Sequence, residues 1–478
     1  MNGQHAGTAL QDVDPYVAVR AQLLARQWEN STRPRAQWFQ ALATAGLTGV
    51  LTKTYRNGLP ELLTAAEVIG AHAAPLSFPA AAGSAAALAV SDNNRAGELL
   101  AAMLAGGKPV LPALQSGAKT LKMGAGGGLR AKPGADGSIV VTGARIAVPD
   151  AAEAAAFIAE AEGPDGIAVF LFDAGLPGMT MELQPDACGN TLGSFSFQDC
   201  TIAAGNILAR GAEALAMLDR TRFSVQLGLA ADLSGLAAAL LTRAGAAQTS
   251  EAGIADALMD ATLARALTYG AAAMAHPANP HALEYIAGAR AAASQACLKA
   301  AQTALATVRE EKHRAVVAGL ARRALVASRI YRQPQAHKLR FVNWRWSAGE
   351  STNFTDLFSA AGAFANGNTA GKPSTAIGEL IQQNNRVRIV ALDAGIAEDL
   401  VFRDAHGAVE LDLAALVCAD AQQQAGSPVP EGFVRSAAAR TRQRLAASLL
   451  HAAGTHAAYA NGEIDFAAAF LDQGQDTR

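Results

Sequence analysis

The chain has 478 residues, of which 51% are hydrophobic and 17% charged, with 39 basic and 41 acidic side chains. A chain of this length is expected to form two or three structural units around large apolar cores. The formal net charge of −2 gives no reason to expect a nucleic acid or an anionic membrane as the main partner. We therefore expect no nucleic-acid partner and no membrane partner.

Four cysteines are scattered along the chain: Cys188, Cys200, Cys297 and Cys418. Their spacing matches no metal site and no disulfide framework, which is typical of free thiols in a reducing compartment. The first residues show no basic-then-apolar signal pattern. The apolar stretch 228–241 is too short to span a bilayer and contains Asp232. These features predict a cytoplasmic protein without a bound metal.

Between residues 15 and 105, apolar side chains recur at helical spacing. Trp38 and Leu42, for example, fall on one face of such a run, and the pair Gly106–Gly107 is a common helix stop. The pattern predicts an N-terminal helical domain over residues 1–107.

After residue 107 the sequence pattern changes to short runs of alternating or β-branched residues, separated by Gly, Pro and Asp. Clear examples are 138–148, 166–174 and 193–202. Regular short strands of this kind are typical of a barrel or sandwich. We predict a β-domain over residues 108–208.

Helical periodicity returns over residues 211–244, 251–275 and 281–330, which predicts a helical bundle over 209–334.

The remainder, 335–478, is a C-terminal extension. Within it, 387–395 and 400–413 are predicted strands, the second a hairpin that turns at His406–Gly407, and the alternation of Trp344 and Trp346 also favours a strand. A last helix is predicted over 433–453. The whole order predicts an α+β fold.

This order, together with four stretches, resembles the acyl-CoA dehydrogenase superfamily. The stretches are 34–51 with 61–81, 136–159, 166–181, and 193–208 with the following LDRTRF at 218–223. The likeness spans roughly residues 30–330. It implies an N-terminal helical domain, a middle β-barrel and a C-terminal helical bundle. It also implies FAD, an acyl thioester on coenzyme A or on a carrier protein, and assembly as a homodimer or homotetramer or with a heteromeric partner.

The resemblance places the flavin ring against two segments. The predicted cofactor-binding residues are Leu114, Gln115 and Ser116, and Ala147, Val148 and Pro149. In the family a Trp-Ile-(Thr/Ser) triplet stands at the second segment, whereas Pro149 has neither an N–H nor a hydroxyl to offer. The family's Arg-x-x-Phe-Gly and Gln-x-x-Gly-Gly motifs are absent from the chain.

A dehydrogenase of this type needs a carboxylate to remove the proton α to the thioester. The family supplies it from one of two places. The first, on a long helix, is occupied here by Thr221. For the second, a late loop, the nearest counterpart is Glu350, which we predict as the catalytic base, although a solvated loop glutamate has the same sequence signature.

The resemblance also implies a substrate-binding role for Asp219, Thr221 and Arg222. Arg222 is expected near the mouth of the thioester pocket. An ion pair between Arg222 and Asp219 across one helical turn is an equally good interpretation.

Three functions fit these residues. The first is α,β-desaturation of a thioester-bound acyl group with hydride transfer to FAD, which is our prediction. The second is a flavin-dependent monooxygenase on the same fold, which needs no α-proton base. The third is a flavin-free partner subunit or binding protein, which the missing flavin motifs favour. Fold resemblance alone does not choose among them.

Overall fold

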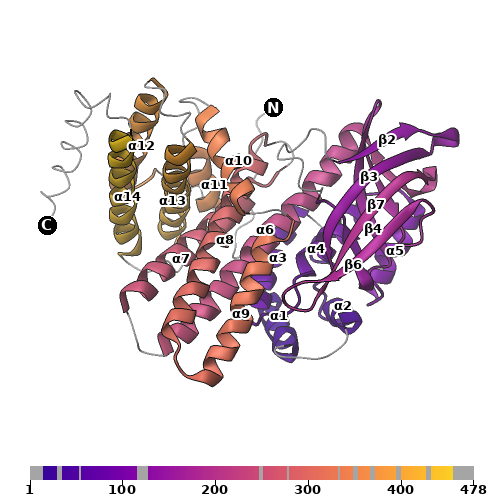
Figure 1. The fold of residues 1–478 in the computed structure, drawn as a ribbon, viewed down its shortest axis with the longest axis horizontal. Helices are drawn as coiled ribbons and strands as arrows, with labels where there is room; N and C mark the ends of the chain where they lie inside the picture. Colours follow the sequence, from indigo (N-terminus) through magenta and orange to yellow (C-terminus); the bar gives the residue numbers. More distant parts are fainter. Residues whose placement is uncertain are drawn as a thin grey trace, which may run out of the picture.

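The computed structural model of the chain describes residues 14–28, 35–52, 55–115, 128–246, 251–276, 279–331, 334–347, 354–366, 372–393, 400–426 and 432–455. Helices, one sheet and further helices follow each other along the chain, and Figure 1 shows the sheet at one end of the molecule and the C-terminal helices at the other. The predicted α+β fold class is confirmed.

Five helices form the N-terminal part: α1 (Pro15–Trp28), α2 (Arg35–Thr44), α3 (Tyr55–Ala71), α4 (Phe78–Ala89) and α5 (Asn94–Leu104). The double glycine ends the last of them as predicted, with Gly106 in the left-handed region at a φ of 89°. Helix α4 is mostly alanine and is buried on all sides from Phe78 to Leu88. Its small side chains let it lie closely between β1 and the long helix α6.

The middle part is one eight-stranded sheet. Its strands are β1 (Val110–Pro112), β2 (Leu129–Pro133), β3 (Ile139–Pro149), β4 (Ala156–Gly163), β5 (Gly166–Phe172), β6 (Met179–Pro185), β7 (Thr191–Ile202) and β8 (Ile207–Arg210). The order is β6-β7-β3-β2-β4-β5-β8, with β1 pairing in parallel with β4. Phe157, Phe172 and Phe195 pack with ring centroids 4.6–5.3 Å apart and form the sheet's buried aromatic core.

Four helices form the bundle: α6 (Gly211–Ala246), α7 (Glu251–Met274), α8 (Ala282–Thr307) and α9 (Glu311–Arg329). The predicted helix over 281–330 is therefore two helices, separated at residues 308–310. In the described part of the chain, α6 alone is long and apolar enough to cross a membrane. However, 83% of its most apolar window is buried inside the fold, as in a core helix.

The described residues of the extension form five helices: α10 (Pro334–Ser347), α11 (Thr355–Asn366), α12 (Thr375–Asp393), α13 (Leu400–Gln424) and α14 (Phe433–Thr455). In Figure 1 these helices lie beside α7 and α8, and α11 and α13 pack directly against α7. The predicted final helix is confirmed as α14.

The strands that we predicted in the extension are wrong. Trp344 and Trp346 lie on helix α10, residues 387–393 lie on α12, and 400–413 lie on α13 without a hairpin at His406–Gly407. A short apolar run has no periodicity long enough to separate a strand from a buried helix. Along α13 the buried side chains follow helical spacing, at Phe402, His406, Val409 and Leu413.

Candidate functional site

Three parts of the fold meet at the end of strand β3. Ser77, which precedes α4, donates a hydrogen bond of 2.6 Å from Oγ to Oδ2 of Asp150, which follows β3. Tyr331, which follows α9, lies with its hydroxyl 3.4 Å from the carbonyl oxygen of Pro112 in β1 and within electrostatic reach of Asp150. We call these residues, Ser77, Pro112, Asp150 and Tyr331, the three-domain junction. The sequence analysis did not find it, because its members come from segments far apart in the chain.

The backbone at this junction is strained. Ala147, Asp150 and Tyr331 have φ angles of 55°, 53° and 59°, in the left-handed region that few residues other than glycine adopt. Such conformations cost about 1–3 kcal/mol each and gather at functional sites. Their concentration beside the predicted ring-binding segment therefore marks the junction as a candidate site.

Asp150 is an unusual carboxyl group. Its side chain is 2% exposed, and its Oδ1 atom has no hydrogen-bond partner. Burial raises the pKa of Asp150 above its ordinary value, although the bond from Ser77 and the charge of Arg35 act in the opposite direction. The junction thus contains a carboxyl group that holds its proton more tightly than a solvated aspartate.

The predicted cofactor residues lie next to this junction. The carbonyl oxygen of Gln115 accepts the N–H of Ile146 at 2.9 Å, which ties the two predicted ring-binding segments together. Leu114 and Ala147 are half-buried, whereas Val148 and Pro149 are buried and pair with β7. Ser116 and Glu350 lie outside the described residues, so their predicted roles stay predictions.

These residues fit the ring of FAD better than its pyrophosphate. The side-chain oxygen of Gln115 and Oδ1 of Asp150 are buried acceptors without partners, and a flavin ring offers an N–H donor. On α6, Arg243 is the described arginine nearest in sequence to the place of the missing Arg-x-x-Phe-Gly motif. Its guanidinium donates to the carbonyl oxygen of Ala239, one turn earlier in its own helix. The dinucleotide end would need other partners.

The predicted substrate residues on α6 are held by charges and by the helix itself. Arg222 pairs with Glu160 of β4 at 3.3 Å and with Asp219 at 3.8 Å, so the ion-pair interpretation is confirmed. Glu160 also pairs with Arg145 of β3 at 3.1 Å. Burial raises the pKa of Asp219, against the effect of Arg222.

This charge chain joins the sheet to the bundle. The sequence analysis missed Glu160, since the sequence of strand β4 gives no sign of which residues its glutamates pair with.

The hydroxyl of Thr221 is bound within its own helix. Its Oγ1 donates to the carbonyl oxygen of Met217 at 2.9 Å, and the side chain is buried. Near Gly83 of α4 and Gly228 of α6, these two helices are almost in backbone contact. A Cβ on Gly228 would lie 2.5 Å from Cβ of Pro79, and one on Gly83 would lie 3.2 Å from Cβ of Ser224. No acyl chain fits between these two helices there.

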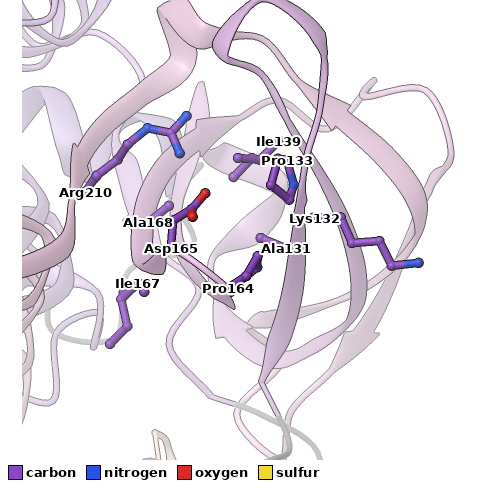
Figure 2. Close-up of a pocket in the computed structure, with 11 residues that line it drawn as sticks. Ala131, Lys132, Pro133, Ile139, Pro164, Asp165, Ile167, Ala168 and Arg210 are labelled. Carbon is purple, nitrogen blue, oxygen red and sulfur yellow. The ribbon is translucent and has the colours of Figure 1, made fainter.

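A small pocket of about 20 Å³ lies at the edge of the sheet, and none of the described site residues that we predicted lines it. Figure 2 shows it between β2, β3 and the β4–β5 turn, with Asp165 and Arg210 at its rim. That volume holds about one water molecule. Within the described ranges, no cluster of three His, Cys, Asp or Glu residues could bind a metal ion.

No family model matches the chain. No curated protein matches it either. Solved structures do match, and an acyl-CoA dehydrogenase complexed with FAD from Bacillus anthracis superposes with a TM-score of 0.70 at 13% identity, over 98% of this chain and 93% of that one.

Butyryl-CoA dehydrogenase from Megasphaera elsdenii matches with a TM-score of 0.57 at 18% identity, over 72% of this chain and 98% of that one. The ChsE4–ChsE5 complex from Mycobacterium tuberculosis matches with a TM-score of 0.58 at 20% identity, over 74% of this chain and 99% of that one.

The protein therefore has the three-part architecture of a helical domain, a sheet and a helical bundle that these structures share. This is the acyl-CoA dehydrogenase fold. The match over 98% of the chain also gives the C-terminal extension a counterpart, which the sequence comparison with the family had left outside the likeness.

Proposed function

We propose that this protein oxidises a short acyl group bound as a thioester to coenzyme A or to a carrier protein, with FAD as the oxidant. The three-domain junction carries this proposal, because a buried carboxyl group and strained backbone lie where the family resemblance brings ring and thioester together. Among the similar structures, one is complexed with FAD and others are named for butyryl-CoA and glutaryl-CoA.

The chain's own residues would position the reactants. Gln115 and the segment Ala147–Pro149 would hold the flavin ring, and FAD when bound supplies the acceptor for the β-hydride. The close approach of α4 to α6 at Gly83 and Gly228 closes the space between those helices, so an acyl chain bound at the junction would have to end before it, which favours a short acyl group.

The proposal is tested by the visible absorption of the purified protein after incubation with FAD. We expect flavin bands at close to one flavin per chain, and anaerobic bleaching by butyryl-CoA but much less by palmitoyl-CoA. Bleaching that needs no oxygen separates a dehydrogenase from a monooxygenase. A protein that stays colourless, or whose flavin no acyl thioester bleaches, would contradict the proposal.

A second candidate is a non-catalytic subunit that pairs with a catalytic one. The observation that favours it is the closed helix pair α4–α6 together with Thr221, whose hydroxyl is bound within its own helix at a position where the family can supply its base. One similar structure was solved as the ChsE4–ChsE5 complex. For this candidate we expect the isolated chain to bind no FAD and to reduce no flavin with any thioester.

A further inference from the structure

The chain has no carboxylate at the first of the family's two base positions, since Thr221 stands there. For the second position, a late loop, Glu350 is the predicted counterpart; it lies outside the described residues and remains the alternative base.

At the junction itself, Asp150 supplies a carboxyl group. One of its oxygens accepts a hydrogen bond from Ser77 and is thereby oriented, while the other is buried and has no partner. A buried acceptor without a partner is rare and costs stability, so it calls for a functional explanation. A thioester whose α-carbon approached this free oxygen would meet a carboxyl already fixed in position.

From this geometry we propose that Asp150 is the catalytic base that removes the α-proton of the acyl thioester in this chain. In the step, Oδ1 of the Asp150 carboxylate forms a bond to the α-proton. The C–H electron pair stays on the substrate as the thioester enolate, and return of the proton reverses the step. The inference rests on the proposed function and places the base on the sheet instead of on the bundle.

The groups around Asp150 allow it to act in this way. Burial makes the carboxylate a stronger base than a solvated one, by raising the pKa of Asp150. The charged and titratable groups that act on it come from four segments: Arg35 of α2, Glu153 after β3, Asp186 after β6 and Tyr331 after α9. Of these, Arg35 alone favours the ionised form.

The test is exchange of the α-protons of butyryl-CoA with D2O, followed by mass spectrometry, because exchange needs no electron transfer. The variant D150N keeps an oxygen that can accept from Ser77 but cannot take up the proton. We expect D150N to slow exchange by on the order of 100-fold or more, with FAD absorbance and the unfolding temperature unchanged. The matched control E153Q removes a carboxylate three residues away and should exchange like the wild type.

A purely structural role for Asp150, as a link between the sheet and α4, gives a different result. In that case S77A, which removes the hydrogen bond to α4, would lose both stability and exchange, whereas D150N, which keeps an acceptor for Ser77, would lose neither. We expect instead that S77A, which keeps the carboxyl group but loses the bond that orients it, exchanges more slowly than the wild type and much faster than D150N.

Exchange by D150N close to the wild-type rate would overturn the inference and leave the proposed function in place. A wild-type protein that neither binds FAD nor exchanges any α-proton would overturn the proposed function, and the inference with it.

Discussion

The three-domain junction and the core of the C-terminal extension each bury a carboxyl group, but the two groups differ in how their oxygens are paired. In the extension, Arg345 and Glu410 are at most 1% exposed and pair at 3.0 Å, and Asn384 donates to the second oxygen of Glu410 at 2.9 Å. At the junction, Asp150 has one partner, Ser77, and one oxygen without any.

The difference shows which region is built to hold itself together and which is suited to bind something else. Paired buried charges fix the packing of helices, because removing either partner leaves an uncompensated charge. A carboxyl group with one unpaired oxygen beside strained backbone is stabilised when a ligand donates a hydrogen bond to that oxygen. The Glu410 carboxylate therefore serves the packing of the extension, and the junction is the candidate site.

The largest expected effect lies in the extension. Burial alone would raise the pKa of Glu410, but Arg345 and His406 beside it hold this pKa below its ordinary value. In E410A, the buried charge of Arg345 loses its partner. We expect a loss of about 3–5 kcal/mol in the free energy of unfolding, measured by urea denaturation.

The control E379A removes a carboxylate that is 57% exposed and 3.9 Å from Arg442, and should cost about 0–1 kcal/mol. Equal losses of stability in the two variants would show that the buried ion pair stabilises the extension no more than the exposed one does.

The pH dependence of stability tests the same core. Burial lowers the pKa of His406 from 6.5 to about 4. Between these values the unfolded chain binds more protons than the folded one, so stability falls as the pH drops from 6.5 to 4, by up to about 1.4 kcal/mol per pH unit.

The variant H406F keeps an aromatic ring to stack on Phe402 and should flatten this part of the profile. Unfolding temperatures recorded across the range measure the effect, with H313Q, at an exposed histidine, as the control. A profile that H406F leaves unchanged would assign the acid sensitivity to other groups.

A smaller effect is expected where α4 meets α6, close to the junction. In G228A the new Cβ would lie 2.5 Å from Cβ of Pro79, which overpacks the contact and should cost about 1–3 kcal/mol by thermal or urea unfolding. At Gly253 nothing lies within 4 Å of such a Cβ, so G253A should leave stability unchanged or raise it. No loss in G228A would mean that the helices separate easily enough to admit an acyl chain.

The smallest effect is expected at the boundary between bundle and extension. Lys299 of α8 lies 2.6 Å from Asp260 and pairs with Asp256, and Arg440 of α14 binds the same two carboxylates. Since Lys299 is 31% exposed and Arg440 remains as a partner, K299A should cost about 0.2–1 kcal/mol, and less in high salt. A loss above about 2 kcal/mol would show that the boundary, and not only the extension's core, depends on its charges.

Local patterns were sufficient to predict the order of helical region, β-region and helical region as far as residue 330, but not the break between α8 and α9. Alternating residues such as those of 193–202 have a period that fits only a strand, and Gly106 ends α5 because glycine adopts the left-handed conformation without strain. The same patterns failed in the extension. There the alternation of Trp344 and Trp346 also fits a helix, whose residues two apart face different neighbours.

The sequence by itself determined the fold class and the likeness to the family, because periodicity and turn residues act between near neighbours. Only the tertiary structure decided that Asp150 meets Ser77 and Tyr331, and that Arg222 pairs with Glu160. These partners lie on different elements of the fold, and whether a buried acceptor is satisfied depends on which of them the packing brings within about 3 Å. The spacing of residues along the chain does not predict these contacts.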